Sequence, residues 1–174
     1  MIVLGLSGSL THDPSAALFV DGELVAAAEE ERFLRDKHAK RKWPLHSARY
    51  CLEAAGVKPA QVEAVAFPFA PFGLGYPGRW HFARRYWYAP DRALMALFNG
   101  NRLFRRNRRA ILKVMGELGL DPARCPFVPV EHHLAHASSA YHLSGFTGKT
   151  AILGIDGKGE YATTFFGYGE NGRI

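Results

Sequence analysis

The chain has 174 residues, enough for one ordinary globular domain with or without a small appended part. Apolar residues make up 48% and charged residues 22%, which supports a hydrophobic core and excludes a wholly disordered chain. No window approaches the roughly 20 consecutive apolar residues of a membrane span, no basic leader precedes the first residues, and the two cysteines are too few for a disulfide framework. We therefore expect a cytoplasmic protein of the mixed α/β class that has no membrane partner.

The formal net charge of +6 is concentrated in one part of the chain. Between Arg79 and Arg109 there are nine arginines, no lysine and a single acidic residue, Asp91, so the remainder of the chain is slightly acidic. Such a basic block could bind nucleic acid, an anionic substrate or an acidic partner domain, or it could simply be a solvent-exposed face.

The first part of the chain has the pattern of three strands, a helix and a fourth strand. An Asp-Gly pair between the second and third strands is a strong hairpin signal. The helix is indicated by apolar residues at helical spacing, with Pro44 at its start and Gly56 at its end. The predicted strands are Val3–Leu6, Ala16–Val20, Glu23–Ala28 and Val62–Phe67.

The second part begins with a loop rich in proline, glycine and aromatic residues over Pro68–Gly78. Two helices, a short strand, a third helix and two further strands follow, and the last two strands repeat the strand–turn–strand pattern of residues 3–20. The pattern Glu170-Asn171-Gly172 predicts a hairpin turn and a returning strand, but the sequence stops two residues later. We therefore expect the chain to be the N-terminal part of a longer protein. The predicted helices are Trp80–Met95, Arg105–Leu118 and Glu131–Tyr141, and the strands are Phe127–Val130, Ala151–Asp156 and Tyr161–Gly167.

The densest cluster of metal-ligating side chains is Glu131-His132-His133-Leu134-Ala135-His136. On a helix, His132 and His136 are one turn apart and point the same way, so two imidazoles can bind one metal ion. The alternative is that these histidines are ordinary polar or capped core positions.

Asp156 is the best candidate for a third ligand, because it ends an apolar strand and precedes a glycine-rich turn. Two histidines and one carboxylate suit Fe²⁺, Mn²⁺ or Zn²⁺. The alternative is an Asp-Gly turn that only joins two strands.

A second candidate site lies near the N-terminus. The glycine turn after the first strand can bring backbone donors near a phosphate, and His12 could act there as an acid–base group. Lys37, in the later run Arg35-Asp36-Lys37-His38, is a plausible contact for an anion.

Three stretches in this order resemble the N-terminal part of the NodU/CmcH-type O-carbamoyltransferases. The stretches are residues 4–18, with His12-Asp13; residues 25–38, with Glu29-Glu30-Glu31-Arg32-Phe33; and residues 130–164, with the histidine cluster and Asp156-Gly157-Lys158-Gly159-Glu160. The resemblance covers nearly the whole chain and is weakest over 68–120. Departures from the family pattern at Ala39, Trp43 and Lys158 remove no candidate ligand.

The resemblance implies an actin/Hsp70-like (ASKHA, ribonuclease-H-like) fold of the Kae1-like type. Residues 1–67 and 120–150 would form the first lobe, residues 68–119 a helical arginine-rich insertion, and residues 151–174 the start of the second lobe. A YrdC-like C-terminal domain, absent from this chain, would make carbamoyl-adenylate from carbamoyl phosphate and ATP, with Mg²⁺. The Kae1-like domain would pass the carbamoyl group to a hydroxyl of a small-molecule or glycan acceptor, and the chain alone would not complete the reaction.

By the same resemblance, His132, His136 and Asp156 match the ligands of a divalent metal, with Fe²⁺ favoured. His12 and Lys37 match positions that handle carbamoyl phosphate or the activated carbamoyl group. The segment that contacts the nucleotide contains Gly157, Gly159 and Thr163.

Two other functions share some of these features. A Kae1-like tRNA threonylcarbamoyl transferase also has paired histidines, but the Glu29–Phe33 run and the arginine-rich helices argue against it. A non-catalytic metal- or RNA-binding module could stack bases on Trp80, Tyr86 or Trp87 beside the arginines. Within the resembled family, docking of another domain or a solvated face is favoured over nucleic acid.

Overall fold

The computed structural model describes residues 1–8, 12–73, 78–157, 159–160 and 162–174. The chain divides into two compact units. The first comprises Met1–Phe67 and Gly73–Val128, and the second comprises Pro68–Phe72 and Pro129–Ile174. The lobe and insertion boundaries implied by the resemblance stay a prediction.

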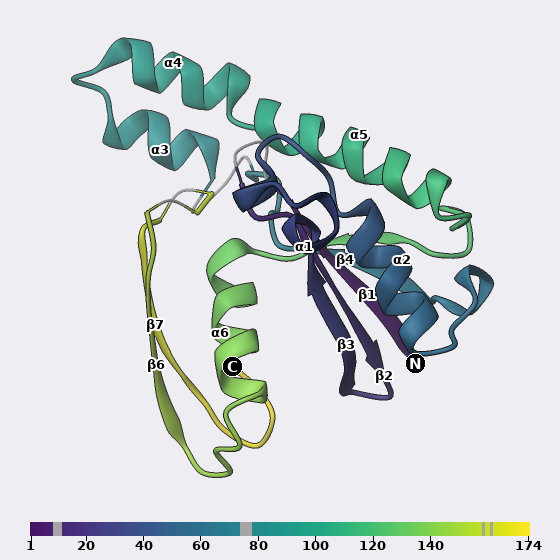
Figure 1. Cartoon of the computed structure of the whole chain (residues 1–174). Helices are drawn as coiled ribbons and strands as arrows, with labels where there is room; N and C mark the ends of the chain where they lie inside the picture. The colour runs from purple at the N-terminus through teal and green to yellow at the C-terminus, as the bar shows by residue number, and fades with distance from the viewer. Residues whose placement is uncertain (9–11, 74–77, 158, 161) are drawn as a thin grey trace. The chain divides into compact units, whose positions relative to one another are not determined.

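A mixed five-stranded sheet forms the centre of the first unit, in the order β3-β2-β1-β4-β5 (Figure 1). Strand β1 lies antiparallel to β2 and parallel to β4, and β2 lies antiparallel to β3. The parallel pair needs a long crossover, and the helix α2 lies in it. This sheet confirms the predicted α/β class. The strands are β1 (Ile2–Ser7), β2 (Ser15–Val20), β3 (Glu23–Glu29), β4 (Ala64–Phe67) and β5 (Phe127–Pro129).

Two tight turns have the geometry that the sequence predicted. Between β2 and β3, Asp21 has φ 52° and Gly22 has φ 90°. Near the end of the chain, Asn171 and Gly172 have φ 51° and 72°, and the flanking residues Glu170 and Arg173 form a β-bridge. Positive φ at both central residues is the type I′ arrangement, whose twist matches that of paired antiparallel strands.

The core of the first unit forms between the sheet and α2 (Leu45–Ala54). Alternate residues of β1 point inward, so Leu4 and Leu6 are fully buried, and Ala48 and Cys51 of α2 are fully buried with them. Each buried leucine of this kind contributes roughly 1.5–3 kcal/mol to folding. The predicted apolar face of the helix is therefore its core face.

Helix α2 ends as the sequence predicted. Gly56 has φ 64° and its N–H donates to the Glu53 carbonyl at 3.0 Å, while the Val57 N–H donates to the Leu52 carbonyl at 2.9 Å. This pair of hydrogen bonds is a Schellman motif, which satisfies the last helical carbonyls and favours glycine because of the left-handed conformation.

The start of α2 is capped by a side chain that the sequence analysis did not assign to this role. Glu30, the first residue of the short helix α1 (Glu30–Leu34), is 1% exposed. Its carboxylate accepts the His46 N–H at 3.1 Å and the Ser47 N–H at 2.8 Å, and it also contacts His46 Nδ1 at 2.6 Å and Ser47 Oγ at 2.8 Å. Pro44 has no side chain that could cap the helix, so Glu30 supplies the acceptor that the free N–H groups need.

The helix predicted over Trp80–Met95 is wrong as a single element. The structure has two helices there, α3 (Arg79–Arg85) and α4 (Pro90–Asn99). Pro90 has no N–H, and its ring excludes the helical conformation at the preceding residue, Ala89, which has φ −130° and ψ 77°. The chain therefore breaks before Pro90, reverses and packs α4 against α3 (Figure 1).

Helix α5 (Arg102–Glu117) begins one turn before the predicted start. Its buried residues Asn107, Ile111, Val114 and Met115 recur at helical spacing, and its arginines lie mainly on the exposed side. In the described part of the chain, no helix combines the length and apolar character needed to cross a bilayer. The remaining short helical turns are η1 (Lys37–Ala39) and η2 (Pro59–Gln61).

The second unit consists of a two-stranded antiparallel sheet and one helix. Strands β6 (Thr150–Ile155) and β7 (Thr164–Gly169) pair along their whole length, and α6 (His132–His142) lies against them (Figure 1). Strand β7 begins at Thr164; Tyr161, the predicted start of this strand, lies outside the described residues. The small core of this unit contains Ala137, Tyr141, Ile152 and Phe165.

Candidate metal centre

Helix α6 carries two candidate ligands, and its start is fixed by the preceding residue. Glu131 is the N-cap, and its carboxylate accepts the Leu134 N–H at 2.7 Å. This hydrogen bond satisfies a free donor of the first turn and sets the helix to begin at His132. His136 then follows one turn later, on the same side of the helix.

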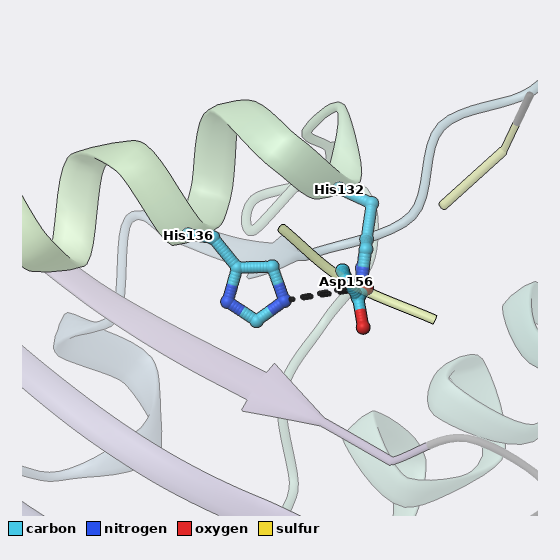
Figure 2. Close-up of side chains that lie close together, drawn as sticks. All are labelled: His132, His136 and Asp156. Atoms are coloured by element: carbon cyan, nitrogen blue, oxygen red, sulfur yellow. Dashed lines mark hydrogen bonds and ion pairs between the residues drawn. The ribbon is translucent and has the colours of Figure 1, made fainter. Parts of the chain in front are cut away.

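The three predicted ligands converge in the second unit (Figure 2). His132 Nε2 lies 2.8 Å from Asp156 Oδ2, His136 Nε2 lies 3.2 Å from His132 Nε2, and His136 Nε2 lies 3.8 Å from Asp156 Oδ2. Asp156 directly follows β6, as the sequence predicted. The structure thus brings together side chains that are 24 and 20 residues apart in the sequence.

The ring of His132 is held in a defined orientation. Its Nδ1 lies 3.0 Å from the Pro68 carbonyl, which can only accept, so Nδ1 carries a proton. The Phe69 ring stands edge-on to the imidazole, with 6.2 Å between the ring centres. Nε2 is therefore the atom presented to Asp156 and His136. A histidine that binds a metal usually has its second nitrogen fixed in this way.

The electrostatics of the site favour an ionised carboxylate. Burial acts to raise the pKa of Asp156, but the Gly157 N–H, which donates to Oδ1 at 2.6 Å, and the His132 ring outweigh it and lower the pKa below its ordinary value. An ionised Asp156 Oδ2 facing His132 Nε2 at 2.8 Å requires a proton or a cation between them, because two lone pairs repel each other.

The spacing of the donor atoms suits one divalent ion. Ligands bonded at about 2.0–2.2 Å to a common ion are about 2.8–3.6 Å apart when the angles at the ion are 90–110°. The three separations in the structure, 2.8, 3.2 and 3.8 Å, fall in or just above this range. Two imidazoles and one carboxylate also leave coordination positions open for water or a substrate oxygen.

The backbone groups after Asp156 already make contacts inside the chain. The Gly157 N–H donates to Asp156 Oδ1, and the Thr163 carbonyl accepts the Asp156 N–H at 2.9 Å. The Gly159 N–H donates to the Ala162 carbonyl at 2.9 Å. The assignment of Gly157, Gly159 and Thr163 to nucleotide contact stays a prediction, as does the assignment of the metal ligands.

Gly159 lies directly against the ring of His133. A Cβ added at Gly159 would overlap His133 Cε1, so the position accepts no side chain without a shift of the ring. His133 is 3% exposed, and neither of its ring nitrogens makes a hydrogen bond to another described residue, although Nδ1 lies 3.4 Å from Glu131 Oε1. Among the described residues, His133 is not one of the side chains whose donor atoms converge at the candidate metal centre.

The other two predicted site residues, His12 and Lys37, belong to the first unit. The Asp13 carboxylate contacts both segments. It lies 2.6 Å from His12 Nδ1 and 2.9 Å from the Nδ1 of His38, the residue after Lys37. The hydrogen bonds from His38 and His12 lower the pKa of Asp13. Asp13 and His38 both have positive φ, 55° and 66°, a strained conformation for residues other than glycine.

Two residues with supporting contacts, Pro68 and Asp13, were not predicted to have a role. A backbone carbonyl such as that of Pro68 leaves no signal in the residue type. Asp13 could have been found from its position directly after His12, because a carboxylate next to a histidine commonly orients the ring.

Comparison with known proteins assigns this α/β chain to a family. The family model described as "Carbamoyltransferase N-terminus" matches residues 2–174. The chain belongs to this carbamoyltransferase N-terminal family.

Two curated relatives are similar to this chain over almost its whole length. The nodulation protein NolNO of Sinorhizobium fredii is 33% identical over 189 residues, which include all of this chain and 26% of NolNO. The protein sll1178 of Synechocystis is 34% identical over 177 residues, which include 99% of this chain and 28% of sll1178. The chain therefore spans little more than a quarter of these relatives' length. Among solved structures, YeaZ from Pseudomonas aeruginosa matches 99% of the chain and 64% of its own length, with 19% identity and a TM-score of 0.45.

Proposed function

We propose that this chain is the metal-binding N-terminal part of an ATP-dependent O-carbamoyltransferase. The carbamoyl group would come from carbamoyl phosphate by way of carbamoyl-adenylate and would pass to a hydroxyl of a small-molecule or glycan acceptor. The observation that carries the proposal is the convergence of His132, His136 and Asp156 in a chain of the carbamoyltransferase family.

The metal would be a divalent ion held by His132, His136 and Asp156, with Fe²⁺ favoured and Mn²⁺ or Zn²⁺ as alternatives. Its chemistry would be that of a Lewis acid, which polarises the carbamoyl carbonyl. The orientation of His132 by the Pro68 carbonyl supports this role, because it aims Nε2 at the other two donor atoms.

The residues of the first unit would handle the acyl donor and the protons. In the transfer step, the acceptor oxygen bonds to the carbamoyl carbon, AMP leaves with the bonding electrons, and the hydroxyl proton passes to a base. His12 suits the base, because Asp13 accepts from Nδ1 and leaves Nε2 as the proton acceptor. The exposed ammonium of Lys37 would pair with phosphate oxygens.

The nucleotide and the fold are further parts of the proposal. The segment containing Gly157, Gly159 and Thr163 would contact ATP or the adenylate, with Mg²⁺ on the phosphates. The fold would be the first lobe of an actin/Hsp70-like domain followed by the start of a second lobe. The antiparallel pairs β1–β2 and β6–β7 support this duplication, since each joins two strands through a glycine-containing loop. A YrdC-like domain of the full-length protein would make the adenylate.

The proposal is tested by the paired substitution His132→Ala and His136→Ala. In this chain, we expect the wild type to bind about one equivalent of Fe²⁺ or Zn²⁺ and the variant to bind none under the same conditions. In a full-length protein that contains this chain, carbamoyl transfer should fall by several orders of magnitude while carbamoyl-adenylate formation persists.

His142→Ala is the matched control, because His142 lies on the same helix and outside the ligand cluster. This variant should bind metal as the wild type does. Stoichiometric metal binding by the double variant, together with unchanged transfer, would refute the ligand assignment.

A further inference from the structure

Glu160 is a buried carboxylate in the segment that follows Asp156. It is 7% exposed, and it belongs to the same unit as the candidate metal centre. Its Oε1 accepts the Ala70 N–H at 2.7 Å and the His132 N–H at 3.0 Å, and Oε2 lies 3.1 Å from the same His132 nitrogen. A buried carboxylate is costly unless it is hydrogen-bonded, so these contacts account for its position.

The two N–H groups that Glu160 accepts belong to parts of the chain that fix a candidate ligand. His132 is the ligand itself, and Ala70 follows two residues after Pro68, whose carbonyl fixes the His132 ring. Glu160 thus holds the backbone of His132 and also the segment that orients its imidazole. Glu160 lies four residues after Asp156. Its hydrogen bond with the His132 N–H therefore connects the segment that carries the carboxylate ligand to the helix that carries the histidine ligands.

From this geometry we propose that Glu160 is a positioning residue for the metal centre. It keeps His132 Nε2 and Asp156 Oδ2 at the separation that a shared divalent ion requires. The inference rests on the proposed function, because it assumes that His132 and Asp156 bind a metal. It assigns to Glu160 a role apart from any nucleotide contact of the surrounding segment. Removal of such a supporting hydrogen bond typically weakens metal binding 10–100-fold.

The test is a Zn²⁺ titration of this chain by competition calorimetry, with the visible spectrum of the Co²⁺-loaded chain as a second readout. Glu160→Met keeps much of the side-chain volume and removes both acceptor oxygens. We expect it to weaken Zn²⁺ binding 10–100-fold and to change the Co²⁺ ligand-field bands. Glu160→Gln keeps one oxygen that can accept from both N–H groups, and we expect it to recover most of the affinity.

Glu131→Met is the matched control, because it removes both acceptor oxygens as Glu160→Met does. Glu131 also accepts an N–H of the first turn of α6, that of Leu134, but it does not contact His132 or the Pro68 segment through a hydrogen bond. We expect it to lower the melting temperature and leave Zn²⁺ affinity within about threefold, below the typical effect of removing a supporting contact. If Glu160→Met does not fold, Glu160→Asp is measured instead, because its shorter side chain cannot reach both N–H groups.

The outcomes separate this inference from the proposed function. If the wild-type chain binds neither Zn²⁺ nor Co²⁺, the proposed function fails. If the wild type binds both and the folded Glu160 variants bind with unchanged affinity and spectrum, the positioning role is overturned and the metal centre stands. Equal losses of affinity in the Glu131 and Glu160 variants would also overturn it, because the effect would then be a general weakening of α6.

Discussion

The cap that Glu30 provides for α2 gives the most quantitative prediction for stability. Glu30→Ala removes the acceptor for two backbone N–H groups, those of His46 and Ser47, and for the Ser47 hydroxyl. These donors are buried or half-buried, and each buried donor left unsatisfied costs about 1 kcal/mol or somewhat more. The expected loss in the free energy of unfolding is therefore about 3–4 kcal/mol.

Urea denaturation of this chain, followed by circular dichroism, measures this loss. With a slope of about 2 kcal/mol per M urea, the midpoint should fall by about 1.5–2 M. Ser47→Ala is the matched comparison, because it removes only the hydroxyl donor and should cost about 1 kcal/mol. A Glu30→Ala variant with a midpoint within about 0.3 M of the wild type would show that the cap contributes little.

The Glu30 carboxylate should also make the stability of the fold depend on pH. Burial acts to raise the pKa of Glu30, but hydrogen bonds from Ser47 and His46 outweigh it, so the folded-state pKa lies below the ordinary value of 4.5. A depressed pKa means that the stabilisation is present above about pH 4.5 and is lost as the pH falls through the folded-state pKa. In Glu30→Gln this acid-induced loss should be smaller, and an equally steep loss below pH 4.5 would contradict the assignment.

Two further predictions concern the arginine-rich helices and a turn. Trp80 and Trp87 of the first unit are 64% and 78% exposed beside the arginines. Under the proposed function we nevertheless expect this chain not to bind single-stranded RNA in a gel-shift titration at moderate ionic strength. RNA binding that weakens steeply as salt is added would favour the RNA-binding alternative. Gly22→Ala should destabilise the chain by about 1–2 kcal/mol, because φ is 90° at this position, and an unchanged melting temperature would contradict the type I′ turn.

The features that could be predicted from the sequence are those with local causes. The spacing of His132 and His136 and the strand before Asp156 sufficed to name three side chains that the structure brings together. The Asp21-Gly22 turn and the closure of α2 at Gly56 were predicted for the same reason. The break before Pro90 also has a local cause, but one continuous helix was predicted over Trp80–Met95 and the effect of the proline was missed.

The supporting contacts could not be predicted, because they depend on how distant segments meet. The Pro68 carbonyl and His132 are 64 residues apart, and Glu30 reaches residues 16 and 17 positions later. Neither contact leaves a periodic pattern or a motif. The contact of Asp13 with His38 likewise depends on the fold, because His38 follows α1 and Asp13 follows β1. Only the folded chain brings the two residues together.

The close packing of Gly159 on His133 affects how mutants in the glycine-rich segment should be interpreted. A methyl group at residue 159 would overlap an enclosed imidazole and displace the neighbouring Glu160, so Gly159→Ala should impair the protein even if no nucleotide ever touches this residue. An inactive Gly159 variant would therefore be poor support for an ATP site. Direct binding of a nucleotide to the unsubstituted protein, read from chemical-shift changes at Gly157 and Thr163, would be the informative measurement.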